Sequence, residues 1–216
     1  MINLIWDLDG TLIDSEQEVL VCLNKAIEAA GLNSKNMKSA FRVGPTVDNI
    51  LRNSFSEEFL CDGKLEKAMR AFRNCYDNSD FSKTHPFEGI DFVIKNVKEY
   101  RHYIITNKPD APSNKIIQKL GWSSYITKLV TPYTFGTDKK NKLMLFNLLV
   151  NLEKLDKNKT YGIGDMDTDM RAAKSAGINT IGVLWGTGTE KELVACNYLC
   201  NSVISLSKLL EALCER

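Results

Sequence analysis

Short apolar runs that end in polar residues recur along the chain, and they constrain its fold more than any other feature. The runs and the polar residues after them are Leu4-Ile5-Trp6 before Asp7, Tyr103-Ile104-Ile105 before Thr106, Tyr161-Gly162-Ile163 before Gly164-Asp165, and the run Thr180-Ile181-Gly182-Val183-Leu184. Their length and their β-branched or aromatic content are typical of buried strands.

Segments with helical periodicity lie between these runs. They cover residues 91–97, 111–120, 142–155 and 168–176, and the last of them stops at Gly177. Strands that alternate with helices predict an α/β fold, a Rossmann-like three-layer core in which helices cover both faces of a parallel sheet. Ligands bind such sheets beyond the carboxyl ends of the strands, where the polar residues named above would lie.

The alternation stops between residues 15 and 81. Ser15-Glu16-Gln17-Glu18 has the pattern of a capping box that opens a helix, and apolar residues at helical spacing follow as far as Ala30. A second apolar stripe runs from Leu65 to Tyr76, with no strand pattern between the two. We therefore expect an α/β core of residues 1–14 and 82–216 with an inserted all-helical domain at 15–81.

Composition excludes several classes of protein. Of 216 residues, 44% are hydrophobic and 25% are charged, which is average for globular proteins and argues against disorder. The formal net charge of +1 gives no electrostatic sign of nucleic acid or of an anionic membrane as partner. No apolar stretch approaches the ~18 residues of a membrane span. We expect neither nucleic acid nor a membrane as a partner.

The cysteines and histidines show no pattern of a metal site. The six cysteines form no CxxC pair and have no metal-ligand spacing with the two histidines, His85 and His102. Reduced thiols in a cytoplasmic protein are the expectation, and no export signal is visible at the N-terminus. Both histidines are expected to be structural, with His102 at the surface just before a strand.

An acidic pair, Asp7 and Asp9, follows the first apolar run and is itself followed by Gly10. Two adjacent carboxylates repel each other, so one carries a proton or a cation lies beside them. Either condition suits an aspartate nucleophile with an acid/base partner. A simple chain reversal at Asp9-Gly10 is the alternative that this pattern alone leaves open.

A second acidic segment, Gly164-Asp165-Met166-Asp167-Thr168-Asp169, follows another apolar run. Carboxylate oxygens at the end of a strand suit a hard cation such as Mg²⁺. The alternative is an acidic helix N-terminus, which we expect for Asp167 and not for Asp165.

Taken in order, these segments resemble the signatures of the haloacid dehalogenase superfamily over nearly the whole chain. The matching segments are Asp7-Leu8-Asp9-Gly10-Thr11-Leu12, Thr106-Asn107-Lys108-Pro109 and Gly164-Asp165 through Asp169. Within the superfamily the chain resembles the phosphoglycolate-phosphatase-like branch. Val43-Gly44-Pro45 is similar to its cap loop, Pro86-Phe87-Glu88-Gly89 to its re-entry into the core, and Gly182-Val183, Trp185-Gly186 and Glu192-Leu193 to its C-terminal end.

The resemblance implies a role for each matching residue. Asp7 matches the nucleophile that forms an aspartyl-phosphate, and Asp9 matches the acid/base, whose backbone carbonyl also ligates Mg²⁺. Asp165 matches a direct carboxylate ligand of the metal, and Asp169 a supporting carboxylate. The implied metal set is therefore Asp7, Asp9, Asp165 and Asp169. The implied substrate-binding set is Gly10, Thr11, Thr106, Asn107 and one lysine, although Thr11 could do no more than shape the loop.

That lysine departs from the pattern of the family, which often has Lys-Pro at this point. Here the chain has Lys139-Lys140-Asn141-Lys142. We favour Lys142 because it begins the helix that runs to Leu155, whereas Lys139 and Lys140 lie in the preceding polar loop. Lys140 is the alternate, and a solvated lysine run is the default outside this context.

The resemblance implies a Mg²⁺-dependent phosphatase that hydrolyses a small phosphomonoester, phosphoglycolate-like or a sugar phosphate, through an aspartyl-phosphate intermediate. A sugar-phosphate mutase or a phosphonatase of the same superfamily is an alternative, as is a non-catalytic relative that binds Mg²⁺ and phosphate to regulate a partner. Asp9 beside Asp7 argues against a dehalogenase and against a phospho-receiver.

The substrate is not fixed by the sequence, because residues 15–81 contain no motif that specifies a leaving group. Arg42 is the candidate cation there for a substrate carboxylate or a second phosphate, and a plain surface arginine is an equal alternative. The sequence also leaves open whether the protein is a monomer or a homodimer.

Overall fold

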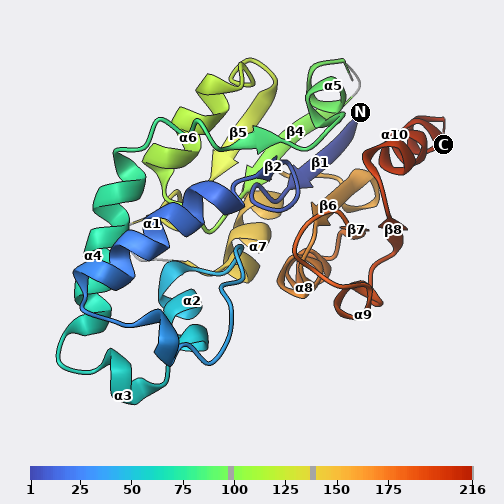
Figure 1. The fold of residues 1–216 in the computed structure, drawn as a ribbon. Coiled ribbons are helices and arrows are strands. Elements are labelled where there is room, and N and C mark those ends of the chain that lie inside the picture. The colour runs from blue at the N-terminus through green and yellow to red at the C-terminus, as the bar shows by residue number, and fades with distance from the viewer. Residues whose placement is uncertain (97–99, 137–139, 216) are drawn as a thin grey trace. The chain divides into compact units, whose positions relative to one another are not determined.

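The computed structural model describes residues 1–96, 100–136 and 140–215 (Figure 1). The chain divides into two compact units, which we call the core unit and the helical unit. The core unit is Met1–Asp14 with Pro86–Arg216, and the helical unit is Ser15–His85. The expected end of the helical domain was residue 81. The short strands β2 (Ile13–Asp14) and β3 (His85–Pro86) pair at the two unit boundaries.

The core unit contains a six-stranded sheet in the order β5-β4-β1-β6-β7-β8. The strands are β1 (Ile2–Trp6), β4 (Tyr100–Ile105), β5 (Ile126–Val130), β6 (Thr160–Gly164), β7 (Asn179–Val183) and β8 (Tyr198–Cys200). All neighbouring strands are parallel. The expected Rossmann-like α/β fold is therefore confirmed, and it includes two strands, β5 and β8, that the sequence did not predict.

Helices connect these strands, with a 3-10 turn at Lys157–Lys159 before β6. They are α5 (Ile90–Asn96), α6 (Asp110–Lys119), α7 (Lys142–Leu152), α8 (Asp167–Ser175), α9 (Glu190–Leu193) and α10 (Val203–Cys214). From the central strand β1 the chain builds one half of the sheet through β4 and β5, then returns to build the other half through β6, β7 and β8. The strand order therefore reverses at β1, and ligands of such sheets usually bind beyond the carboxyl ends of the strands at such a point.

One face of the sheet packs against α7 and α8. The cluster joins side chains from β1, β4 and β5 to the buried sides of the two helices, among them Ile5, Tyr103, Phe146, Leu149 and Ala173. Side chains of a strand point alternately to the two faces of the sheet, so every second strand residue lies on this face. The packing fixes both helices on the sheet, and with them the residues at which each helix starts.

Helix α7 ends at Leu152, three residues before the expected end at 155. Lys154 has a left-handed backbone (φ 50°), and the amide of Leu155 donates to the carbonyl of Val150. This is the hydrogen-bond pattern of a Schellman helix end. It turns Leu155 back into the core and leaves Leu152 exposed.

His102 lies inside β4 and is buried, so its predicted place at the surface is wrong. It pairs with Leu4 in the register of β1, and its Nδ1 accepts a hydrogen bond of 3.0 Å from Trp6 Nε1. Burial lowers the pKa of His102 to about 4. The imidazole is therefore neutral near pH 7 and acts as an acceptor inside the core.

The helical unit consists of four helices with a 3-10 turn at Ser34–Asn36. The helices are α1 (Glu16–Ala29), α2 (Val47–Ser54), α3 (Glu57–Leu60) and α4 (Lys64–Asp77). The predicted capping box is wrong, because Ser15 makes no side-chain capping bond. Glu18 instead accepts hydrogen bonds from Ser79 Oγ (2.5 Å) and from the amide of Lys83 (3.0 Å), which fasten the segment after α4 to α1. None of the described helices is both long and apolar enough for a membrane span.

Helices α1 and α4 are joined by a disulfide between Cys22 and Cys75, so the expectation of reduced thiols is wrong for this pair. The two cysteines are 53 residues apart, and helix packing brings their Cα atoms to 5.5 Å. That distance lies within the range a disulfide spans. The remaining cysteines, Cys61, Cys196, Cys200 and Cys214, form no disulfide.

We expect the disulfide to stabilise the helical unit by restricting the unfolded chain. Closing a loop of 53 residues is worth up to about 4 kcal/mol in the chain-entropy description. Cys75→Ser should therefore lower the midpoint of thermal unfolding under non-reducing conditions, whereas Cys61→Ser, at an exposed unpaired cysteine, should not. In denaturant without reductant, an alkylating reagent should label four thiols. Six labelled thiols would show that the bond is absent.

Candidate active site

Asp7 is the first residue after the central strand β1, and its side chain is buried. The amide of Asp7 donates to the carbonyl of Ile163 on β6 (2.8 Å), and the amide of Leu8 donates to Asp7 Oδ1 (2.7 Å). The first bond extends the sheet ladder by one residue, and the second holds the carboxylate. Asp7 is therefore fixed at the point where the strand order reverses.

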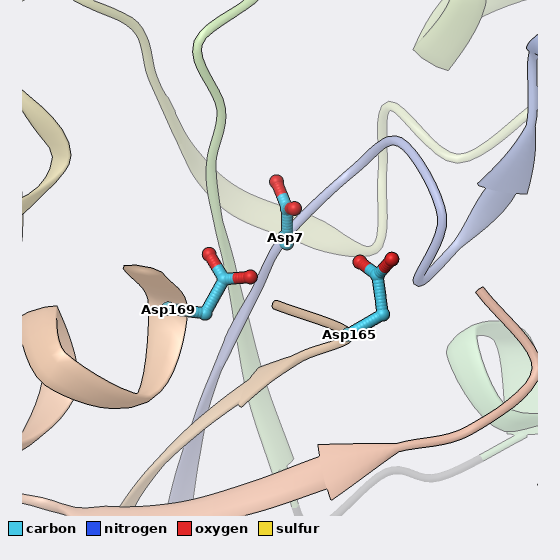
Figure 2. Close-up of side chains that lie close together, drawn as sticks. All are labelled: Asp7, Asp165 and Asp169. Carbon is cyan, nitrogen blue, oxygen red and sulfur yellow. The ribbon is translucent and has the colours of Figure 1, made fainter. Parts of the chain in front are cut away.

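Two further carboxylates lie beside Asp7. Asp165 follows β6 directly, and Asp169 lies in the first turn of α8. The three residues offer oxygen atoms within 4.8 Å of one another, and Figure 2 shows their carboxyl groups directed toward a common space. All three side chains are buried.

Burial has the largest effect on the pKa values of Asp7 and Asp165. It raises the pKa of Asp7 well above the usual range, and Asp169 and Asp165 raise it further, against the opposing charge of Lys142. Burial and Asp169 likewise raise the pKa of Asp165. The protein thus gathers negative charge where a cation would stabilise the ionised carboxylates.

Lys142 brings a buried positive charge to the cluster. Its Nζ lies 2.8 Å from Asp7 Oδ1 and 2.5 Å from Asp169 Oδ1. Burial alone would lower the pKa of Lys142, but Asp169 and Asp7 outweigh it and raise the pKa above the usual value. The ammonium therefore stays charged.

The start of α7 gives Lys142 its direction. Asn141 caps the helix by accepting a hydrogen bond from the amide of Met144 (3.0 Å), so Lys142 is the first helical residue. Of Lys140 and Lys142, the two lysines of the run that the structure describes, Lys142 is the one whose ammonium reaches Asp7. The amide of Lys140 bonds to the carbonyl of Pro132 in the preceding loop, and Lys139 lies outside the described residues.

Asp165 is held on both of its oxygens. Thr11 Oγ1 donates to Oδ1 (3.1 Å), and the amide and hydroxyl of Thr187 donate to Oδ2 (2.8 and 3.2 Å). Sequence reasoning missed Thr187. The polar segment Gly186-Thr187-Gly188 after the run 180–184 was the signal that could have found it, since polar residues follow the other runs in the same way.

Glycines leave room for the Asp165 side chain. Gly10 has a left-handed backbone (φ 82°), and a Cβ at this position would lie 2.5 Å from Asp165 Oδ2. A Cβ on Gly186 would lie too close to the carbonyl of Gly10, and a Cβ on Gly188 too close to the carbonyl of Asp165. The loops after β1 and β7 can therefore surround Asp165 only without side chains at these positions.

Thr11 is fully buried, and its hydroxyl is used on Asp165. The carbonyl of Thr11 accepts a hydrogen bond from Trp185 Nε1 (3.0 Å). Thr11 thus positions Asp165 and links the loops after β1 and β7. In this structure the Thr11 hydroxyl donates to Asp165, which is a loop-shaping contact.

Asp9 lies apart from the three-carboxylate cluster and pairs with Lys108. Lys108 Nζ is 2.8 Å from Asp9 Oδ1, and the lysine side chain is almost fully buried. Sequence reasoning placed Lys108 in the Thr106-Asn107-Lys108-Pro109 segment but gave it no role. Its position directly after the proposed phosphate-binding pair was the available signal.

Thr106 and Asn107 follow β4 at the same edge of the sheet. Thr106 is buried, and its Oγ1 accepts a hydrogen bond from the amide of Lys108 (3.1 Å), which leaves the hydroxyl hydrogen to donate. The half-buried side chain of Asn107 makes no hydrogen bond to another described residue. Asp167 begins α8 and pairs with Arg171 (2.8 Å), in agreement with its expected place at a helix N-terminus.

The site has the oxygen ligands that a hard cation requires. Asp7, Asp165 and Asp169 present only oxygen atoms, and Lys142 neutralises one of their three charges. Within the described part of the chain, Asp7 Oδ2 has no hydrogen bond or ion pair. Buried carboxylates with an available oxygen fit Mg²⁺, which takes few protein ligands and keeps several waters.

Comparison with known proteins gives relatives over almost the whole chain. A family model described as haloacid dehalogenase-like hydrolase matches residues 4–183. A phosphoglycolate phosphatase of Aquifex aeolicus is 28% identical over 190 residues, covering 85% of this chain and 84% of that protein. A phosphoglycolate phosphatase of Vibrio parahaemolyticus is 26% identical over 216 residues, covering 95% of this chain and 93% of that protein.

Solved structures share the fold. A haloacid dehalogenase-like family hydrolase from Streptococcus pneumoniae superposes with a TM-score of 0.82 at 18% identity, covering 97% of this chain and 98% of that one. A predicted phosphatase from Clostridium acetobutylicum gives a TM-score of 0.80 at 22% identity, with the same coverage.

We expect Gly10→Ala to weaken Mg²⁺ binding by about tenfold or more, because the new methyl group displaces the Asp165 carboxylate; a tenfold loss corresponds to about 1.4 kcal/mol. Isothermal titration of the purified protein with MgCl₂ measures this. Gly121→Ala is the matched control, since Gly121 also has a positive φ (69°) but has no neighbouring atoms within 4 Å of a Cβ. Equal affinities in the two variants would contradict the placement of Mg²⁺ beside Asp165.

Proposed function

This chain belongs to the haloacid dehalogenase-like hydrolase family, and from that membership we propose that it is a Mg²⁺-dependent phosphatase of small phosphomonoesters that acts through an aspartyl-phosphate on Asp7. The observation that carries the proposal is the position of Asp7. It lies at the end of the central strand with Lys142 on one oxygen, and with Asp165 and Asp169 beside it.

In the first step, an oxygen of Asp7 attacks the phosphorus atom of the substrate. The bond between phosphorus and the alcohol oxygen breaks, and that oxygen takes a proton from Asp9 as the alcohol leaves. The products of this step are the free alcohol, the aspartyl-phosphate and ionised Asp9.

In the second step, Asp9 takes a proton from a water molecule, whose oxygen attacks the phosphorus atom. The bond between phosphorus and the Asp7 oxygen breaks, which releases inorganic phosphate and restores the Asp7 carboxylate. Asp9 is protonated again, and the cycle is complete.

Asp7 and Asp165 would hold Mg²⁺ through their carboxylates, with the backbone carbonyl of Asp9 as a further ligand and Asp169 in support through its ion pair with Lys142. When bound, Mg²⁺ would supply positive charge that offsets the repulsion between the Asp7 carboxylate and an anionic phosphoryl group. Lys142 holds Asp7 in place and neutralises charge that develops during transfer.

Hydrogen-bond donors complete the proposed phosphate site. The Thr106 hydroxyl and the Asn107 amide would donate to phosphoryl oxygens without adding charge, together with the backbone at Gly10. Phosphoryl transfer depends mainly on positioning and on charge neutralisation, and this set of residues provides both.

The substrate class follows from the family and from the relatives' names. The phosphoglycolate phosphatases among the relatives make a small, acidic phosphomonoester the first candidate. We propose that residues 15–81 act as a substrate-selecting cap. Arg42 is exposed in the helical unit and is the candidate there for a second anionic group. A cytoplasmic location and a monomer or homodimer complete the proposal.

Asp7→Asn should abolish phosphate release while leaving the fold intact, because an amide oxygen is a far weaker nucleophile than a carboxylate. The measurement is phosphate release from p-nitrophenyl phosphate and from phosphoglycolate with MgCl₂, and circular dichroism checks the fold. A variant that keeps substantial turnover would exclude the aspartyl-phosphate route. Phosphate binding without release by the wild-type protein would favour a regulatory role.

Lys142→Ala should lower kcat by about two orders of magnitude, the usual effect of removing one preorganised charge from such a site. Lys140→Ala removes the same charge two residues earlier and should stay near the wild-type rate. If Lys140→Ala is the impaired variant, the lysine of the site has been assigned to the wrong residue.

A further inference from the structure

The ion pair between Lys108 and Asp9 is a second buried contact of opposite charges at the site, separate from the contacts of Lys142. The side chain of Lys108 is 5% exposed and that of Asp9 is 14% exposed, with 2.8 Å between Nζ and Oδ1. The pair connects the loop after β4 to the loop after β1. Both loops lie at the carboxyl edge of the sheet, where Asp7 also lies.

The backbone on the Lys108 side is fixed. The amide of Lys108 donates to Thr106 Oγ1, and Pro109 precedes the first residue of α6 with its restricted φ. On the Asp9 side, the amide of Gly10 donates to the carbonyl of Ile13 (2.9 Å) and closes the turn after β1. Asp9 is followed by Gly10, whose left-handed backbone turns the chain away from β1. The ion pair therefore joins two loops whose backbones are each held by hydrogen bonds.

Stability alone does not account for a buried lysine at this position. The desolvation of two buried charges often cancels their attraction, and apolar side chains of similar size do as well or better. Methionine would fill the same space without a charge. The charge of Lys108 is therefore better explained by what it does to Asp9.

We propose that Lys108 is a positioning residue that fixes the Asp9 carboxylate for proton transfer, an inference that rests on the proposed function. Asp9 must meet two partners in succession, first the oxygen of the leaving alcohol and then a water molecule. Both transfers need a carboxyl group held within hydrogen-bond reach of its partner. Lys108 acts on Asp9 as Lys142 acts on Asp7, so the two lysines divide acid/base positioning from nucleophile positioning.

The test uses two substrates that differ in the basicity of the leaving group. Nitrophenolate leaves readily without a proton, whereas the more basic phenolate needs one, and p-nitrophenyl phosphate and phenyl phosphate otherwise have nearly the same shape. The value of kcat/KM reports the steps up to formation of the aspartyl-phosphate. In Lys108→Met, the loss of kcat/KM should be larger with phenyl phosphate than with p-nitrophenyl phosphate, by about tenfold or more. This difference is a part of what a general acid usually contributes.

Three further variants make the result specific. Asp9→Asn should shift the ratio of the two kcat/KM values in the same direction, and Lys108→Met should add little to the ratio in the double variant, because both changes act on one proton transfer. Lys115→Met, at an exposed lysine of α6, should leave the ratio unchanged. Equal losses on both substrates would show that Lys108 binds phosphate or supports the fold, and would overturn the proposal.

The outcome separates this inference from the proposed function. If Asp7→Asn is inactive and Lys108→Met shows no change in the ratio, the phosphatase mechanism stands and the role of Lys108 is wrong. If Asp7→Asn is active, the proposed function itself fails.

Discussion

Lys142 lies between Asp7 and Asp169 and allows carboxylates to be buried side by side. Three carboxylates with oxygens within 4.8 Å repel one another, and burial away from water increases the cost of their charges. The ammonium of Lys142 offsets part of this cost only if the end of β1 and the starts of α7 and α8 keep their relative positions. The close packing of α7 and α8 on the sheet keeps these positions fixed.

The same requirement explains how the loops around the site are built. Each loop supplies either a charge or a hydrogen-bond donor to a neighbour: Lys108 to Asp9, and Thr11 and Thr187 to Asp165. Glycines are needed where the backbone passes close to a carboxylate, as at Gly10 and Gly186. The loops of the site thus hold one another in place, and the order of the strands in the sheet brings these loops together.

The sequence predicted the inner strands and the helices between them, because these elements are buried on one or both sides and show clear apolar patterns. It missed β5 and β8, which are the two edges of the sheet. Edge strands are partly exposed, so β5 mixes polar with apolar residues and β8 is only three residues long. His102 was misplaced because one polar residue in a buried strand looks like a boundary when its partner, Trp6, is 96 residues away.

Within the site, residues at strand ends were recognisable because each follows its own apolar run. Asp7, Thr106 and Asp165 are of this kind. Contacts between segments could not be read from one segment alone. The pairing of Lys108 with Asp9 and the disulfide between Cys22 and Cys75 depend on packing across long stretches of chain, which leaves no local spacing to detect.

The central position of β1 has a consequence for the newly made protein. The groups that hold Asp165 come from both Thr11 and Thr187, which lie on opposite sides of it in the sequence. An emerging chain must therefore extend from Thr11 as far as Thr187 before the last of these contacts can form. A product of early termination, even one long enough to contain β6 and α8, lacks the loop after β7 and leaves Asp165 with only one of its two threonine partners. Synthesis as far as the loop after β7 is thus a condition for assembling this site.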